Sequence, residues 1–131
     1  MDFSNYLANA TINATTRGVA YSPPVKVWVA LYTTNPSKDD TGVEVTGATY
    51  TREELTLSSP VSGVSTNENL MQWNTATTAW GIVTHVTIHD SSVGGNLLYF
   101  TELDVPKNIE VGDQFQITIN NLKLTLSLIH I

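Results

Sequence analysis

His85 and His89 are the residues in this chain whose type and spacing come nearest to a metal site. On a helix, this spacing would place both imidazoles on one face, within reach of a single zinc ion. The surrounding residues 82–90 alternate like a strand instead, and such a strand separates the two side chains by ~13 Å. We therefore expect surface or subunit-contact histidines that do not share an ion. His130 would join them only through a contact made by the fold.

Three carboxylate clusters are also candidates for chemistry. They are Glu53 with Glu54, Asp39 with Asp40, and Glu102 with Asp104. The adjacent glutamates belong to a predicted strand and point to opposite faces, so they cannot act as an acid/base pair. The aspartate pair lies in a loop without the ligand alternation of an EF-hand, and we expect a turn or solvated charges there. The third cluster is expected to face solvent at a strand end.

The sequence does not indicate nucleophilic catalysis. Serine and threonine are abundant, but there is no G-x-S-x-G motif and no cysteine. Gly94 and Gly95 fall in a predicted hairpin loop rather than between a strand and a helix, which argues against a phosphate-binding loop. We predict that the protein is not an enzyme and that it binds no metal or cofactor.

The aromatic residues offer one binding alternative. Trp28, Trp73 and Trp80, together with five tyrosines, could form a platform that stacks on sugar rings if they were exposed. Packing in the core or at an interface is the more frequent use of such side chains, and we favour it here.

Charge and length limit the remaining classes. The net charge is −6, and the six lysines and arginines are scattered along the chain, so we expect no nucleic-acid partner. The 131 residues are enough for one domain with one core. No apolar run approaches the ~20 residues of a membrane helix, and the first residues do not read as a signal peptide. We expect no membrane contact and folding in the cytoplasm of the producing cell.

The elements that position these residues are mostly strands. Alternating apolar residues separated by turn residues predict seven strands, at residues 25–32, 51–57, 70–73, 82–90, 97–102, 114–120 and 122–128. Both faces of the first strand are apolar, so we expect it to be covered on both sides. This pattern predicts a mainly β protein with a single jelly-roll-like β-sandwich domain at residues 22–131.

Residues 1–21 are expected to form an N-terminal arm, a helix followed by an extended segment. Phe3, Tyr6, Leu7, Ala10 and Ala14 have the spacing of one helical stripe. The helix is short, and the β-branched and Asn residues of its second half disfavour helix. It therefore needs a docking surface, either its own sheet or another subunit. We expect Phe3, Tyr6, Leu7 and Ala10 to form an assembly interface.

Several short motifs, in a fixed order, resemble a family of small virion proteins of tailed bacteriophages. They are VALYTTNP, TG-EV-G and YTRE within residues 29–54, Trp80-Gly81, Thr84-His85-Val86, Asp90, the segment GGNLLY at 94–99, and Val111-Gly112-Asp113. Members of this family are usually labelled tail fibre proteins, and some relatives act as capsid cement or decoration proteins.

The resemblance implies a structural virion protein. We expect a capsid cement or decoration protein on the head surface that contacts the major capsid protein, or another virion structural protein, and forms a homo-oligomer. One alternative is a tail fibre or baseplate-associated protein. A different kind of alternative is a receptor-binding module for host glycans, which requires an exposed aromatic side chain in a polar pocket.

Overall fold

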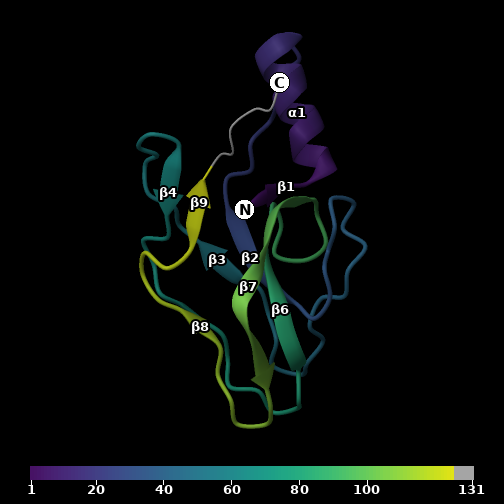
Figure 1. Cartoon of the computed structure of the whole chain (residues 1–131), viewed down its shortest axis with the longest axis vertical. Helices are drawn as coiled ribbons and strands as arrows, with labels where there is room; N and C mark the ends of the chain where they lie inside the picture. The colour runs from purple at the N-terminus through teal and green to yellow at the C-terminus, as the bar shows by residue number, and fades with distance from the viewer. Residues whose placement is uncertain (126–131) are drawn as a thin grey trace.

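The protein is mainly β, with one helix near the N-terminus, as the computed structural model shows (Figure 1). The structure describes residues 1–125. In chain order its elements are β1 (Asp2–Phe3), α1 (Asn5–Thr16), β2 (Val27–Tyr32), β3 (Glu53–Leu55), β4 (Val64–Thr66), β5 (Met71–Gln72), β6 (Gly81–His89), β7 (Leu97–Ile109), β8 (Gln116–Ile117) and β9 (Lys123–Thr125). The predicted fold class is therefore confirmed.

Five strands form the main antiparallel sheet, in the order β1-β7-β6-β2-β3. Strand β2 lies inside it, paired with β6 on one side and β3 on the other. All four residues from Val29 to Tyr32 are buried, although they alternate between the two faces. The expectation that this strand is covered on both sides is confirmed.

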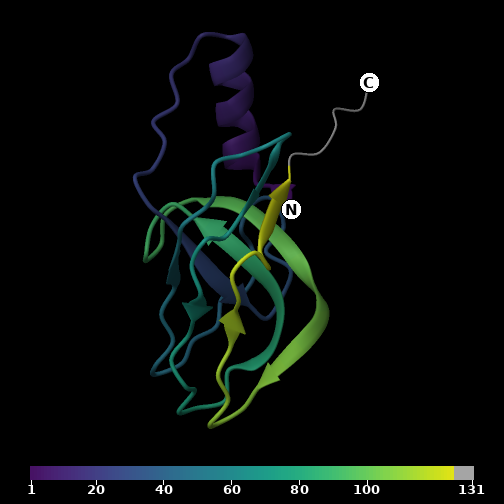
Figure 2. The same ribbon diagram turned by 90° about the vertical axis from the view of Figure 1, so that its left-hand side faces the viewer.

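A second layer covers one face of this sheet. It contains two small antiparallel pairs, β5 with β8 and β4 with β9 (Figure 2). Val29 and Leu31 of β2 belong to the same apolar core as Trp73 and Phe115 of the second layer. The rings of Trp73 and Phe115 meet edge to face, 5.3 Å apart. The two layers therefore pack as the predicted sandwich requires.

The opposite face of the sheet carries Ala30, Tyr32, His85, Thr87 and His89, which alternate with the core residues of β2 and β6. The loop of residues 33–44 covers this face, and its Pro36 is fully buried. Gly42 allows the loop to fold tightly, because a Cβ there would lie 2.7 Å from the Cα of Pro36. This covering loop makes a second interior, which is polar.

Several predicted boundaries are wrong. The segment predicted at 51–57 is strand only over β3, and β7 continues well past residue 102 to Ile109. Strands β1 and β4 were not predicted. Most of β7 beyond residue 102 is exposed and contains Pro106, so no alternation of burial marks it as strand. Of the last predicted strand, β9 covers the first part; residues 126–128 and His130 lie outside the described residues.

Phe3 does not belong to the helical stripe. It pairs with Tyr99 in β1, and the helix begins only at Asn5, because Ser4 has an extended backbone and caps it. Helix α1 has 12 residues and is neither long nor apolar enough to cross a membrane, and the described chain has no other helix.

Candidate interaction site: the N-terminal arm and the polar cluster at its base

The base of the N-terminal arm, residues 1–21, is fixed to the sheet by the cap of its helix. The hydroxyl of Ser4 accepts a hydrogen bond from the backbone N–H of Leu7 at 3.0 Å. The backbone N–H of Ser4 donates to the carbonyl of Leu98 at 2.9 Å. Because Ser4 is only 1% exposed, this cap is an interior feature of the domain.

Two of the four predicted interface residues pack on the chain's own sheet. Leu7 is 6% exposed and belongs to the core. The ring of Phe3 lies 5.4 Å from that of Tyr99. Tyr6 is 43% exposed, and Ala10 is partly exposed. Of the four, therefore, Tyr6 and Ala10 have surface to offer a partner, whereas Phe3 and Leu7 hold the arm in place.

A second anchor joins the start of α1 to the covering loop. The backbone N–H of Asn5 donates to the carbonyl of Lys38 at 2.9 Å, and its side-chain amide donates to the carboxylate of Asp39 at 2.6 Å. The helix is thus tied to both Leu98 on β7 and the loop that covers the polar face. Its direction is set by the body of the domain.

Beyond its first turn the arm stands out from the domain (Figures 1 and 2). Ile12 on the helix is 57% exposed, and Val19 on the returning chain is 49% exposed. The backbone N–H groups of Arg17 and Val19 both donate to the carbonyl of Asn13, which closes the turn at the tip. The arm therefore combines a fixed base with an exposed apolar tip.

A buried polar cluster lies under the covering loop, around His89, whose side chain is fully buried. The hydroxyl of Tyr32 donates to one oxygen of Asp40 at 2.7 Å and lies 3.3 Å from Nε2 of His89. The other oxygen of Asp40 lies 3.5 Å from the same nitrogen, and the hydroxyl of Thr87 lies 3.0 Å from Nδ1. Both ring nitrogens of His89 are therefore partnered within the chain.

The electrostatics of this cluster favour its neutral histidine. Burial lowers the pKa of His89, and the nearby charge of Arg52 lowers it further. Burial also raises the pKa of Tyr32, and the hydrogen bond to Asp40 adds to this effect. Because His89 has no exposed surface, it cannot reach a substrate, and the cluster's role is to hold the loop on the sheet.

An ion pair continues the network toward the 91–96 hairpin loop. Two nitrogens of Arg52 donate to the two carboxylate oxygens of Glu44, each at 2.9 Å, and the hydroxyl of Tyr50 donates to the same carboxylate at 2.7 Å. A third nitrogen of Arg52 donates to the carbonyls of Ser91 and Gly94, each at 2.8 Å. Burial alone would raise the pKa of Glu44, but these partners outweigh it and lower the pKa. One side chain thereby joins two loops.

Nearly the whole chain matches one known protein family. Residues 2–125, which are almost all of the chain, match the family described as Podophage GP4 fiber I protein gp80. The chain belongs to this family. No curated protein matches it. The resemblance to a phage virion family with tail fibre labels is confirmed.

The two histidines lie in the interior of the domain. Both were expected to be surface or subunit-contact histidines, and the surface position is wrong, because His85 is 7% exposed and His89 is fully buried. The reason is the covering loop, which turns an apparently outward face of β6 into an interior. Within residues 1–125, no three His, Cys, Asp or Glu side chains come together as metal ligands would. That these two histidines share no zinc ion stays a prediction.

The carboxylates divide into two kinds. Glu102 has a side chain that is 77% exposed, and Asp104 is exposed, so the expectation that they face solvent is confirmed. They lie within β7 rather than at a strand end. Asp39 and Asp40 were expected to be a turn or solvated charges, and both are exposed residues of a turn. Asp39 also accepts a hydrogen bond from Asn5, and Asp40 accepts one from Tyr32. Asp40 has a φ of 56°, in the left-handed region, and its side chain remains 32% exposed.

Sequence reasoning also missed Arg52 and Glu44. Each is one charged residue among many in the sequence. Arg52 lies in the YTRE motif and Glu44 in the EV motif, but neither motif indicated an ion pair. The tryptophans were interpreted correctly in two cases: Trp73 and Trp80 are buried, at 0% and 5% exposure, and pack in the core.

Proposed function

We propose that this protein is a structural component of a podophage fibre that joins other virion proteins through its N-terminal arm. The observation that carries this proposal is the contrast within the arm. Ser4, Asn5 and Leu7 fix its base to the domain, whereas Ile12 and Val19 expose apolar surface at its tip. A protruding element with a fixed base and exposed apolar side chains offers surface for a partner to cover.

The residues 1–21 and 22–131 then have separate roles. The sandwich supplies a stable body, and the arm supplies contact with a neighbour, either another virion structural protein or a second copy of this chain. Phe3 and Leu7 act through the arm's position, and Tyr6 and Ala10 extend its contact surface toward the tip. No chemical reaction is part of this role.

A capsid cement or decoration protein on the head is the second candidate. The observation in its favour is that the sequence shows no fixed-period repeat of the kind that builds elongated repeat proteins. Such a protein would use the same arm to reach the major capsid protein, so the arm does not distinguish the two roles.

A host-glycan module has less support. Sugar stacking needs an exposed aromatic face, and Trp73 and Trp80 are committed to the core. Among the tyrosines, Tyr32 is buried, and Tyr50 is bound to Glu44 and to the backbone of Leu31. Tyr6 is 43% exposed, but it lies on the proposed contact surface of the arm. We therefore favour an assembly role over recognition of a host sugar.

The location of the protein in the particle tests this proposal. Purified virions that carry an epitope tag in the exposed loop at Val93 should be labelled with gold-conjugated antibody and imaged. Labels confined to the tail support a fibre role, and labels spread over the head support the cement role. Particles that lack the protein altogether, as judged by mass spectrometry, would contradict both.

A further inference from the structure

The arm is fixed to the domain through residues 2–7. Strand β1 pairs with β7, and the backbone N–H groups of Ser4 and Asn5 donate to the carbonyls of Leu98 and Lys38. Every copy of the chain presents this same docking surface on β7 and the covering loop. The segment therefore fits a neighbouring copy as well as its own domain.

The connection between α1 and β2, residues 17–26, is held by few hydrogen bonds. Eight of its ten residues are exposed, and only Tyr21 and Pro24 are partly buried. No backbone hydrogen bond joins residues 20–25 to the rest of the described chain. Pro23 and Pro24 favour an extended backbone here. A different path for this connection therefore breaks few interactions.

The arm is also the part of the molecule that a second copy can approach with least repulsion. Within residues 3–25 the only charged side chain is Arg17. Because Arg17 contributes +1 to the net charge of −6, the rest of the chain carries −7. Two bodies of this charge repel each other at close range, whereas two arms each bring a single charge. Contact through the arms keeps the bodies apart.

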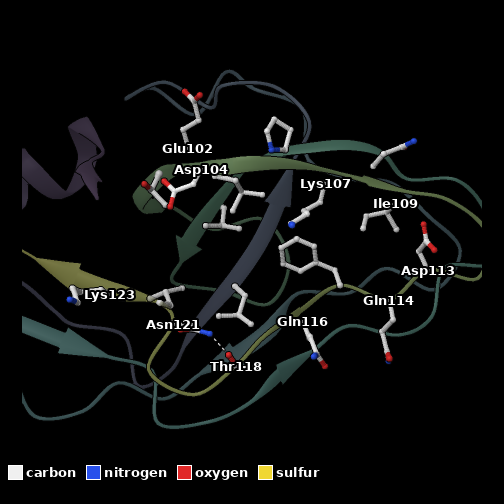
Figure 3. A pocket seen from close by; sticks show the side chains of 18 of the residues that line it. Glu102, Asp104, Lys107, Ile109, Asp113, Gln114, Gln116, Thr118, Asn121 and Lys123 are labelled. Carbon is white, nitrogen blue, oxygen red and sulfur yellow. Dashed lines mark hydrogen bonds between the residues drawn. The ribbon is translucent and has the colours of Figure 1, made fainter.

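A groove in the body offers little to a second copy. It has a volume of about 920 Å³ and lies between the second half of β7 and the chain at 113–123 (Figure 3). Ile109, Phe115 and Leu122 line it, but none of them is more than 7% exposed. Its exposed lining includes the charged side chains of Glu102, Asp104, Lys107, Asp113 and Lys123. The groove therefore lacks the apolar surface that forms the centre of a stable interface.

Contact between two unexchanged arms would be too small for a stable dimer. Tyr6, Ile12 and Val19 expose apolar surface on the arm, at 43%, 57% and 49%. A fully buried aromatic side chain covers ~150–250 Å². Three half-exposed side chains therefore fall short of the ~800 Å² that each partner buries in a typical stable interface. Exchange of the docked segment would add the whole base of the arm to the contact.

The connection is long enough for such an exchange. Its ten residues, 17–26, span up to ~33 Å when extended, whereas the 12 residues of α1 span ~18 Å. Two packed helices lie ~8–10 Å apart. The chain can therefore pass from the tip of an arm docked on one copy into β2 of the other.

We propose that two copies of this chain exchange residues 1–16, so that the segment of each docks on β7 and the covering loop of the other. The exchanged contacts are identical to those within one chain, so the exchange costs little free energy. With the arms antiparallel, Ile12 and Val19 of one copy lie beside Tyr6 and Ala10 of the other, and the bodies lie at opposite ends. This proposal rests on the assembly role of the arm and names a second copy as its partner.

The test uses the absence of cysteine from the chain, which makes an engineered disulfide the only one. Phe3→Cys with Tyr99→Cys joins β1 to β7 at residues that lie directly opposite each other. Ile82→Cys with Asn108→Cys is the matched control, an opposite pair within the body across β6 and β7. Each purified variant is oxidised, and a non-reducing denaturing gel shows whether the bond lies within one chain or between two.

Two further measurements accompany the disulfides. Size-exclusion chromatography with light scattering gives the mass of the full chain in solution, and far-ultraviolet circular dichroism establishes that each variant is folded. A second pair, Asn5→Cys with Asp39→Cys, is joined by a short bis-maleimide. Both residues are exposed and their side chains are bonded to each other, so this pair serves if loss of the aromatic rings unfolds the domain.

We expect a dimeric full chain, chain-to-chain bonds for both arm pairs, and a bond within one chain for the control. A monomeric full chain would overturn the proposal, and so would arm pairs that close within one chain. Equal chain-to-chain bonding in the control would mark random collision and equally contradict it. These measurements use the purified chain, whereas incorporation into virions tests the assembly role of the arm, so each can fail without the other.

Discussion

Strand β2 and helix α1 belong to the same small domain but differ in almost every contact they make. The four residues from Val29 to Tyr32 are all buried, and both faces of the strand are covered. Of the 12 residues of α1, Leu7 alone is buried. The body of the domain thus provides most of the folding stability. The surface that the arm exposes becomes buried only when a partner binds.

The difference follows from elementary energetics. A fully buried leucine stabilises the folded state by ~1.5–3 kcal/mol relative to an exposed one. Burial of the β2 residues therefore offsets the conformational entropy that the strand loses on folding. An isolated helix of fewer than ~12–15 residues is marginal in water, and the Thr and Asn residues of α1 weaken it further. The arm is therefore ordered mainly by its anchors to Leu98, Lys38 and Asp39.

Truncating the core should show the largest effect of this contrast. Leu31→Ala should lower the free energy of unfolding by about 3 kcal/mol, because Leu31 is fully buried and its loss leaves a cavity. Ile12→Ala on the arm should change it by less than about 0.5 kcal/mol. Urea unfolding followed by tryptophan fluorescence measures both, and similar losses for the two variants would contradict the division between body and arm.

The ion pair of Arg52 should show the next largest effect. Arg52→Ala leaves Glu44 without its partner and removes the bonds to the 91–96 loop, so we expect a loss of about 2–3 kcal/mol. The estimate lies below that for a fully buried pair because the Glu44 side chain is 26% exposed. Lys26→Ala is the control, since Lys26 pairs with Glu54 at the surface and should contribute less than about 1 kcal/mol.

The polar cluster should give a smaller, pH-dependent effect. Burial holds the pKa of His89 below its ordinary 6.5, so between these two values the unfolded chain binds more protons. Stability should then fall as pH drops below about 6.5, by at most about 1.4 kcal/mol per pH unit from this one group. Tyr32, Asp40, Arg52 and Glu44 face this cluster, and Glu44 adds its own decline at lower pH.

His89→Gln should flatten that decline between about pH 7 and about pH 5 in urea unfolding experiments. His85→Gln removes the other described histidine, outside the cluster, and should retain it. An equal slope in the wild type and His89→Gln would show that the cluster is not coupled to protonation.

The same contrast explains what could be predicted from the sequence. Burial of β2 on both faces was correct because both faces carry their own apolar residues, which is local information. The start of the helix was wrong because Phe3 has the right spacing, yet Ser4 caps the helix and places Phe3 in β1. The apolar spacing favours a helix that includes Phe3, whereas the Ser4 cap favours a helix that begins after Ser4. The hydrogen bond from the Ser4 N–H to the Leu98 carbonyl favours the second arrangement.

The polar cluster was out of reach for a different reason. His89 meets Asp40 from a loop 49 positions earlier in the chain, and nothing in a strand pattern shows which loop will cover it. The groove lined by the second half of β7 and the chain at 113–123 is equally non-local. Periodicity shows which face is apolar, but not which distant segment lies over a polar one.

The central claim, attachment through the arm tip, is tested most directly by virion incorporation. Ile12→Asp with Val19→Asp places charges on the tip, and Val93→Asp with Val111→Asp places the same charges on exposed valines of the body. Copies per particle are measured by quantitative mass spectrometry of purified virions carrying each double variant. We expect the tip variant to be lost from particles and the body variant to be retained at wild-type copy number. Wild-type incorporation of the tip variant would contradict the account.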